Sequence, residues 1–394
     1  MTEGALGPHP AVWSVTTWLL TEGRRSASVP ALLQALASQL RPVVPVDRVW
    51  VGTEVLHPQA AAYLWVWEAG AEPVDREVSY DRFALLQGQD SPARRLQRVA
   101  GSEVRFVHDG DDGHDLADVT SLWARGYREL VGQSLVGRER WEGAVTWATR
   151  HEEGFDDVQR SILRGVMPAV SAVVDGFAQA RVRATLLQTY LGEDAGRRVA
   201  EGQVHRGEVR THRGAIWFSD VRGFTQLSQR AGQDELLAVL NEVLGHTVEA
   251  VGAHGGQVLK FMGDGVLAVF SEAEAGDGRA VCAAAMAAAL QLQERLGARA
   301  DDADHEEASV LARVGVGLHY GSFAYGNIGA PSRLDFTAIG PDVNLAARVE
   351  GQCSGLAERV LATEEVASRV DKAQLVARRP LKGIGGEVPL YRLG

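Results

Sequence analysis

Two aspartates stand where the sequence predicts the end of a strand and a tight turn. Asp220 directly follows the apolar run 215–219, and Asp264 lies in the segment 260–265 between two apolar runs. If the first strand lies beside the hairpin in one sheet, both carboxylates meet at the same end of that sheet. Such a pair suits Mg²⁺, which prefers oxygen ligands, and two ions could clamp the oxygens of an in-line displacement. Taken singly, each aspartate is more often a structural turn or capping residue.

A third polar cluster occupies residues 335–348. Asn344 and Arg348 are four apart on a predicted helix, so they share one face. Arginine offers a forked cationic donor to a phosphate, and asparagine can orient a sugar hydroxyl. An isolated arginine of this kind is usually an ordinary surface residue. The cluster therefore gains weight only together with the two aspartates.

The elements that must position these residues alternate between strand and helix from about residue 214 onward. The βαββαβ opening, extended by further strands, predicts a ferredoxin-like α/β (α+β) sandwich over residues 214–394. The predicted strands are 215–219, 257–261, 266–270, 313–320, 324–328, 335–339, 373–379 and 387–392, and the predicted helices are 234–253, 278–296 and 342–351.

Residues 1–177 form a second predicted unit of mixed α/β type. A helix is predicted at 29–40 and strands at 47–56, 61–68, 104–108, 128–136 and 144–149. This order resembles the GAF-type sensor domains, although it contains no diagnostic motif. Eight of the nine tryptophans precede residue 150. We interpret them mainly as core residues, with the wall of a ligand pocket as the alternative.

Between the two units the sequence predicts a helical connector over residues 178–213. Apolar residues recur every three or four positions from residue 155, which is typical of one helix face. Pro168 and Gly176 are expected to kink or interrupt this helix. We expect residues 155–177 to pack on the first unit, with a two-stranded dimer connector as the alternative. Residues 185–192 resemble the segment that precedes many bacterial cyclase domains, and we expect them to transmit the state of the sensor.

Residues 218–225, 260–265 and 335–348 together resemble the three signature blocks of class III adenylyl/guanylyl cyclases, in the same order and at similar spacing. The resemblance covers roughly residues 214–393. It implies Asp220 and Asp264 as metal ligands, with Val221 as a further metal-binding position. It also implies that Asn344 aligns the ribose and that Arg348 stabilises charge on the α-phosphate. These aspartates, Asn344 and Arg348 form the implied catalytic set.

The same resemblance assigns the substrate-binding positions. Lys260 and Thr337 match the positions that read adenine, Lys382 matches the lysine that holds the terminal phosphates, and Phe224 and Thr225 are added from the first block. A lysine can donate to adenine N1, and a threonine hydroxyl can accept from the 6-amino group. Guanylyl members usually carry a Glu/Cys-like pair instead. Thr337 differs from the aspartate of many animal enzymes and resembles a bacterial subgroup.

The implied reaction converts ATP to 3′,5′-cyclic AMP and pyrophosphate with two Mg²⁺ ions per site, Mn²⁺ being an alternative. In this family the metal aspartates of one subunit face the Asn and Arg of the other, so we expect a homodimer with shared sites. The first unit would receive an unknown small-molecule or protein signal. A nucleotide-binding pseudo-cyclase and a guanylate cyclase remain the alternatives, and whether Asp220 accepts the proton is open.

Composition excludes other classes. The 394 residues suffice for two domains, and a net charge of −11 argues against nucleic-acid binding. Cys282 and Cys353 match neither a disulfide framework nor a metal spacing, and no secretory signal is visible. The most membrane-like segment, 280–292, is too short to span a bilayer. We therefore expect a cytoplasmic protein without membrane insertion.

Overall fold

The computed structural model describes residues 9–88, 91–98, 103–108, 116–136, 141–302 and 314–394. The chain divides into two compact units, Met1–Leu186 and Leu187–Gly394. Helix α6 (Asp157–Leu191) contains the point of division, and the expected domain boundary at residue 177 also falls inside this helix. The expected start of the second domain at residue 214 falls inside strand β7 (Val209–Val221).

The first unit is built on a six-stranded antiparallel sheet with the order β3-β2-β1-β6-β5-β4. Its edge strand β3, which carries mostly exposed polar residues, was not predicted from the sequence. The other five strands lie within a few residues of the predicted positions. The bounds are β1 Arg48–Glu54, β2 Ala60–Glu68, β3 Val74–Ser79, β4 Glu103–Val107, β5 Glu129–Val136 and β6 Trp141–Thr149.

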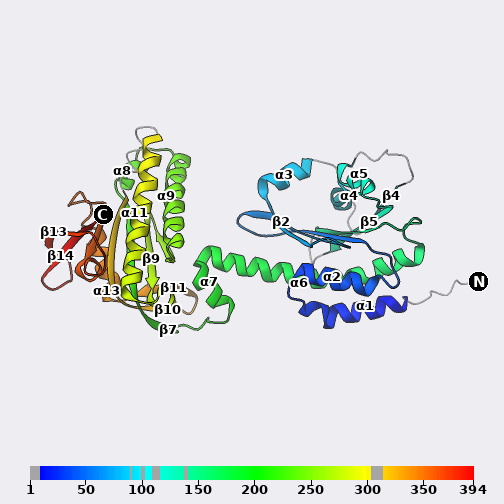
Figure 1. Ribbon diagram of the computed structural model, residues 1–394, viewed down its shortest axis with the longest axis horizontal. Helices are drawn as coiled ribbons and strands as arrows, with labels where there is room; N and C mark the ends of the chain where they lie inside the picture. The colour runs from blue at the N-terminus through cyan, green and yellow to red at the C-terminus, as the bar shows by residue number, and fades with distance from the viewer. Residues whose placement is uncertain (1–8, 89–90, 99–102, 109–115, 137–140, 303–313) are drawn as a thin grey trace, which may run out of the picture. The chain divides into compact units, whose positions relative to one another are not determined.

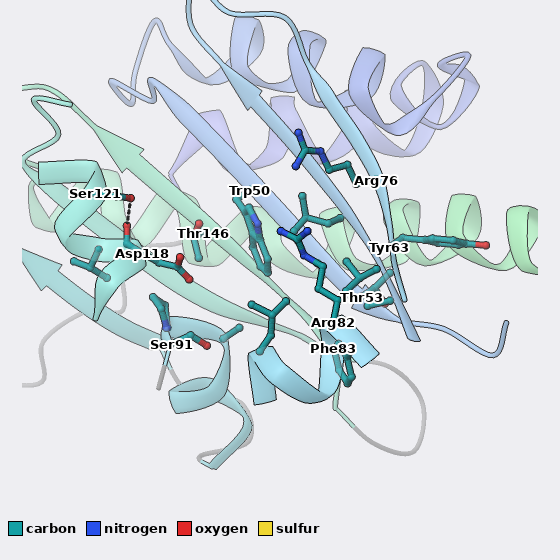
Figure 2. A pocket seen from close by; sticks show the side chains of 18 of the residues that line it. Trp50, Thr53, Tyr63, Arg76, Arg82, Phe83, Ser91, Asp118, Ser121 and Thr146 are labelled. Carbon is teal, nitrogen blue, oxygen red and sulfur yellow. Dashed lines mark hydrogen bonds between the residues drawn. The ribbon is translucent and has the colours of Figure 1, made fainter. Parts of the chain in front are cut away.

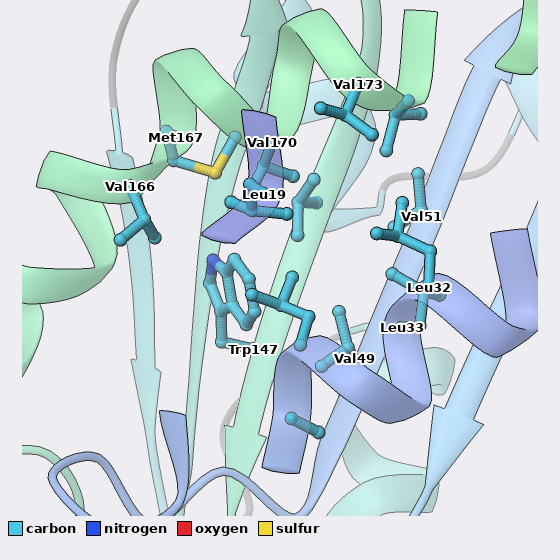
Figure 3. Close-up of a cluster of buried hydrophobic side chains, with 14 of the residues drawn as sticks. Leu19, Leu32, Leu33, Val49, Val51, Trp147, Val166, Met167, Val170 and Val173 are labelled. Atoms are coloured by element: carbon cyan, nitrogen blue, oxygen red, sulfur yellow. The ribbon is translucent and has the colours of Figure 1, made fainter. Parts of the chain in front are cut away.

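Helices cover both faces of this sheet (Figure 1). One face packs on α1 (Pro10–Thr21), α2 (Val29–Leu40) and α6, and the other carries α3 (Tyr80–Gly88), α4 (Pro92–Arg98) and α5 (Ala117–Ala124). Figure 3 shows the main core, where side chains of α2 and α6 meet Trp147 and the strand residues beside it. The tryptophans of this unit whose side chains are described lie in different environments: four are buried, Trp18 is partly buried against the core, Trp50 lines a cavity and Trp13 is 70% exposed. The buried ones are Trp65, Trp67, Trp123 and Trp147.

Helix α6 runs without a break through Pro168, so of the two expected effects, a kink or an interruption, the interruption does not occur. A proline removes one helical hydrogen bond. Here the loss is offset because a long apolar stripe of the helix, including Val166, Val170 and Val173, is buried against the sheet. The expectation that residues 155–177 pack on the first unit is confirmed.

The second unit contains an eight-stranded sheet with the order β13-β14-β12-β10-β7-β9-β8, and β11 pairs with β10. Strands β7, β8, β9 and β10 with the helices between them give the predicted βαββαβ order. Strand β12 was not predicted. The bounds are β8 Gln257–Met262, β9 Gly265–Ser271, β10 Val314–Ala330, β11 Arg333–Ile339, β12 Val360–Thr363, β13 Ala373–Pro380 and β14 Glu387–Leu393.

Alternation along β7 sends its side chains to two different cores. Ala215 and Trp217 face the core formed with α9 (Gln233–Ala253) and α11 (Gly278–Asp302). Ile216 faces the opposite core, which contains residues of α7 (Glu193–Ala200) and α13 (Pro341–Glu350). Asp220 lies four residues after Ile216 on β7, so the two side chains project from the same face of the sheet. The shorter helices are α8 Phe224–Ser228, α10 Glu272–Ala275 and α14 Glu364–Ala367.

Strand β10 is continuous, whereas the sequence predicted two strands that break near residue 321. A Cβ atom on Gly321 would lie 2.2 Å from Oδ2 of Asp342. The backbone amide of Ser322 donates to that same oxygen at 2.7 Å. The glycine therefore marks the close approach of α13 and not the end of a strand. The predicted first residue of this strand, 313, lies outside the described residues.

Within the described residues, two helices are long and apolar enough to cross a membrane by length and composition alone, namely α6 and α9. They are not the Ala-rich segment 280–292 that the sequence singled out. Half of the apolar window of α6 is buried inside the structure, which gives this helix a packing role. The apolar window of α9 is 28% buried, and the helix contributes Val239, Val243 and Val251 to a core.

Candidate active site

Asp220 and Asp264 meet at one end of the sheet of the second unit. Strand β7 pairs with β9 as far as Ser219 opposite Val266, so Asp220 lies beside the β8–β9 hairpin. The hairpin turns tightly at Gly263, whose φ of +69° is accessible to glycine at low cost. A Cβ atom on Gly265 would lie 3.2 Å from Oδ1 of Asp220. The structure therefore brings the two predicted carboxylates together.

Negative charge is concentrated at this point. Burial raises the pKa of Asp220 to about 6, and the neighbouring Asp264 carboxylate adds to the shift by its charge and a hydrogen bond. Burial likewise raises the pKa of Glu350 to about 7, with the Asp220 carboxylate adding to this effect and Arg222 opposing it. Sequence reasoning missed Glu350, which lies at the C-terminal end of α13. A bound cation would relieve the repulsion among these carboxyl groups.

The oxygen donors at this end of the sheet fit Mg²⁺ better than a metal held entirely by the protein. In the described parts of the chain, no group of three or more His, Cys, Asp and Glu is arranged to hold an ion. Asp220 and Asp264 provide carboxylate oxygens, and Val221, the last residue of β7, can provide only its backbone carbonyl. Mg²⁺ usually takes one or two carboxylates and completes its shell with water and substrate phosphates.

Lys260 and Thr337 lie on strands β8 and β11. The Lys260 Nζ atom donates to Oδ2 of Asp335 at 2.7 Å. Asp335 and Thr337 are two residues apart on β11, so they project from the same face of the strand. Thr337 is buried, and its hydroxyl has no hydrogen-bond partner within the described residues. Sequence reasoning gave Asp335 no role, although its spacing from Thr337 was a usable signal.

Asn344 and Arg348 lie on the exposed face of α13. The helix buries Val343, Ala346 and Val349 on its other side. Among the described residues the side chains of Asn344 and Arg348 make no hydrogen bond or ion pair, and so none with Asp220 or Asp264. Their predicted shared face is confirmed.

The remaining predicted positions are mixed in exposure. Lys382 is exposed, just beyond the end of β13, and Thr225 is exposed at the start of α8. Phe224 packs partly against the core. Gly223, with a φ of +79°, turns the chain from β7 into α8.

Close packing of α13 on β10 fixes the position of this helix. A Cβ atom on Gly317 would lie 2.3 Å from the backbone nitrogen of Glu350, and one on Gly315 would lie 2.9 Å from Oε1 of the same residue. At position 317 only glycine allows the helix to come this near to the strand, whereas the flexible Glu350 carboxylate can move away from a side chain at position 315. Gly317 thus helps to determine where Asn344 and Arg348 are presented.

Residues 209–391 match the family described as the adenylate and guanylate cyclase catalytic domain. The chain is 34% identical over 163 residues to an adenylate cyclase of Anabaena cylindrica, a match that covers 41% of this chain and 31% of the relative. It is 34% identical over 164 residues to adenylate cyclase 1 of Rhizobium meliloti, covering 42% and 24%. The chain therefore spans less than a third of the length of these relatives, and the match supports a cyclase catalytic domain in its second unit.

The chain is also similar to solved structures of two cyclases. A bacterial light-regulated adenylyl cyclase has a TM-score of 0.49 at 21% identity, covering 58% of this chain and 65% of its own. The adenylyl cyclase CyaB from P. aeruginosa has a TM-score of 0.41 at 26% identity, covering 48% and 96%.

Proposed function

We propose that this protein is an adenylate cyclase that converts ATP to 3′,5′-cyclic AMP and pyrophosphate. The observation that carries the proposal is the meeting of Asp220 and Asp264 at one sheet end, within residues that match a cyclase catalytic domain. The raised pKa of Asp220 supports a site that gains from a bound cation.

Asp220 and Asp264, with the backbone carbonyl of Val221, would hold two Mg²⁺ ions, and Mn²⁺ would be an alternative. When bound, such ions make the 3′-hydroxyl more acidic and neutralise charge on the triphosphate. This role fits the donor set described above, which leaves coordination positions for the substrate phosphates.

In the proposed reaction the ribose 3′-oxygen attacks the α-phosphorus. The new P–O bond forms as the bond to the β-phosphate oxygen breaks, so pyrophosphate leaves. The hydroxyl proton passes to Asp220 or to water. Arg348 would donate to the α-phosphate oxygens as their charge grows, a type of interaction that acts mainly in the transition state. Asn344 would orient the ribose, and Lys382 would bind the terminal phosphates, with Phe224 and Thr225 beside them.

We further propose that the active site is shared between two copies of the chain. The exposed, unpaired state of Asn344 and Arg348 among the described residues supports this, because these side chains are available to a partner. The hairpin that carries Asp264 also exposes Phe261 and Met262 by 51% and 41%, and such apolar exposure is typical of an interface.

Base selectivity is proposed to rest on Lys260 and Thr337. The ammonium of Lys260 is a donor that suits adenine N1, and the unsatisfied Thr337 hydroxyl can accept from the 6-amino group. Guanine presents the opposite pattern, which disfavours the guanylate cyclase alternative. The pseudo-cyclase alternative is disfavoured because the proposed positions carry residues able to act.

The first unit is proposed to be a GAF-like sensor in a cytoplasmic protein. Its antiparallel sheet with helices on both faces supports this proposal. Helix α6 begins in the core of the first unit and is followed by α7 in the second. There the buried Asp194 accepts hydrogen bonds from Arg197 and Arg198, and Ala195 packs in a core. We propose that α6 and α7 transmit the state of the sensor.

Incubation of the purified full chain with ATP or GTP, and with Mg²⁺ or Mn²⁺, tests the proposal by product mass. We expect cyclic AMP from ATP alone, and none from Asp220→Ala. Cyclic GMP would overturn the assignment of Lys260 and Thr337. Absence of product with each metal would favour the pseudo-cyclase, unless a chain that starts near Thr185 is active, which would instead indicate inhibition by the first unit.

A further inference from the structure

The first unit contains a cavity of about 410 Å³ that the proposed catalytic chemistry does not use (Figure 2). It lies between the sheet and helices α3, α4 and α5, on the face opposite the main core. Pockets of this volume accommodate small organic molecules rather than single ions. Among the described residues, no group of three or more His, Cys, Asp and Glu is placed to hold an ion at this cavity.

The sheet side of the cavity presents a flat aromatic surface. Trp50 and Gly52 are two residues apart on β1 and face the same way. A Cβ atom on Gly52 would lie only 2.4 Å from the Trp50 ring, so the indole lies across the strand at the glycine. Leu64 and Phe83 add further apolar surface. The cavity is therefore suited to stack a planar ring.

Charged residues of both signs line the cavity. Arg48, Arg76 and Arg82 line it and make no ion pair within the described residues, and the acidic residues Glu54 and Asp118 line it as well. The charges of Asp118 and of nearby Glu68 act on Arg48 without forming a salt bridge to it. By contrast, the lining residues Arg125 and Glu77 are paired with Glu68 and Arg181.

Among these arginines, Arg48 gives the strongest evidence for a bound hydrogen-bond acceptor. Its Nε atom is buried without a hydrogen-bond acceptor among the described residues. Burial lowers the pKa of its guanidinium, as expected for a cation held away from water. Arg76 and Arg82 are exposed at the rim, and Figure 2 shows Arg82 extending from α3 toward Trp50. A buried donor without an acceptor is costly unless a ligand supplies one.

We propose that this cavity binds a planar aromatic or heteroaromatic oxyanion, a carboxylate or a phosphate. Its ring stacks on Trp50, and its anionic group accepts hydrogen bonds from Arg48, with Arg82 closing the rim. The binding itself does not depend on catalysis. Only the effect of the ligand on turnover rests on the proposed function of the first unit as a sensor.

Isothermal titration calorimetry on the full chain tests the proposal with three matched probes: 2-naphthoate, 2-naphthyl phosphate and the neutral 2-naphthamide. We expect at least one anion to bind at least about tenfold more tightly than the amide, because charge-assisted hydrogen bonds are worth that factor or more. Which anion binds better distinguishes a carboxylate ligand from a phosphate ligand. Equal affinity of both anions and the amide, or no binding of either anion at millimolar concentration, overturns the proposal.

Variants locate the site. Arg48→Gln should weaken the bound anion about tenfold or more and leave the amide unchanged, whereas Arg24→Gln, an exposed arginine outside the cavity, should change neither. Gly52→Val should displace the Trp50 ring and weaken all three probes. If Arg48→Gln does not fold by circular dichroism, Arg82→Gln gives the same comparison with a smaller expected loss. Unchanged anion affinity in the folded arginine variant refutes the assignment.

The two proposals fail in different ways. Asp220→Ala should abolish turnover and keep full affinity for the anion. Binding without any effect on wild-type turnover would leave the cavity assignment intact and refute the sensor role. Turnover by a chain that binds none of the anions would leave the proposed catalytic function intact and refute the cavity assignment.

Discussion

Replacement of Asp220 by asparagine should stabilise the metal-free second unit near pH 8. The pKa of Asp220 is raised from its ordinary value of 3.8 to about 6. Each pKa unit corresponds to about 1.4 kcal/mol, so ionisation of Asp220 in the folded chain would cost about 3 kcal/mol without solvent screening. The carboxyl group is only half-buried, and screening reduces the expected gain of the variant to about 1.5 kcal/mol.

The sign of this effect depends on pH. Because the folded pKa is raised, the folded chain holds the proton more tightly than the unfolded chain. Asp220 is therefore neutral in both states only well below its ordinary pKa of 3.8, and its cost to stability grows as the pH rises from there through the folded pKa of about 6. The variant should gain most near pH 8 and gain much less near pH 4.

Hydrogen exchange measured by mass spectrometry on peptides of β7 and β9, over a urea series, isolates the second unit. Tryptophan fluorescence cannot do so, because eight of the nine tryptophans belong to the first unit. Asp371→Asn is the matched control, since that side chain is 91% exposed and its removal should change stability by less than about 0.5 kcal/mol. Added Mg²⁺ should stabilise the wild type and not Asp220→Asn. A variant that is less stable near pH 8 without metal, or equally stabilised near pH 4, would refute the electrostatic reasoning.

Three further predictions concern packing and chemistry. Gly317→Ala should lower the free energy of unfolding in urea by about 1–3 kcal/mol, because the new Cβ meets the backbone of Glu350. Gly245→Ala, with open space around it in α9, should raise the free energy of unfolding by about 0.5–1 kcal/mol. Equal effects of the two variants would contradict the packing argument. Thr337→Val should leave the melting temperature unchanged or raised, since it removes an unsatisfied buried hydroxyl, and lower ATP turnover about tenfold; unchanged turnover would rule out adenine recognition by this hydroxyl. Arg348→Ala should keep the melting temperature and lower the turnover number about 100-fold or more; a variant with wild-type turnover would remove Arg348 from the mechanism.

Local patterns predicted most of the fold because they report which face of an element is buried. The apolar run 215–219 of β7 and the apolar stripe of α6 both led to the observed elements. The errors arose where a local signal has a tertiary cause. Gly321 looks like a strand break but admits Asp342, and Pro168 looks like a helix break but lies in a helix held by its buried face.

Some contacts of the candidate site could be predicted from the sequence and others could not. The meeting of Asp220 with Asp264 could be predicted because the βαββαβ order indicates a ferredoxin-like sheet, in which the first strand lies beside the hairpin. The contact of Lys260 with Asp335, and the place of Glu350 beside the carboxylates, join segments that are distant in the chain. Such contacts depend on strand order and helix placement, which residue spacing does not specify.

The unbroken helix α6 has a consequence for how such proteins can be assembled from parts. Because the division between the units falls within a regular helix, every residue inserted or deleted there rotates the downstream residues by about 100° and moves them by about 1.5 Å. Seven inserted residues nearly restore the original phase, whereas three or four leave it offset by tens of degrees. A different domain joined at this junction therefore keeps the original phase of the downstream part of the helix only at certain lengths.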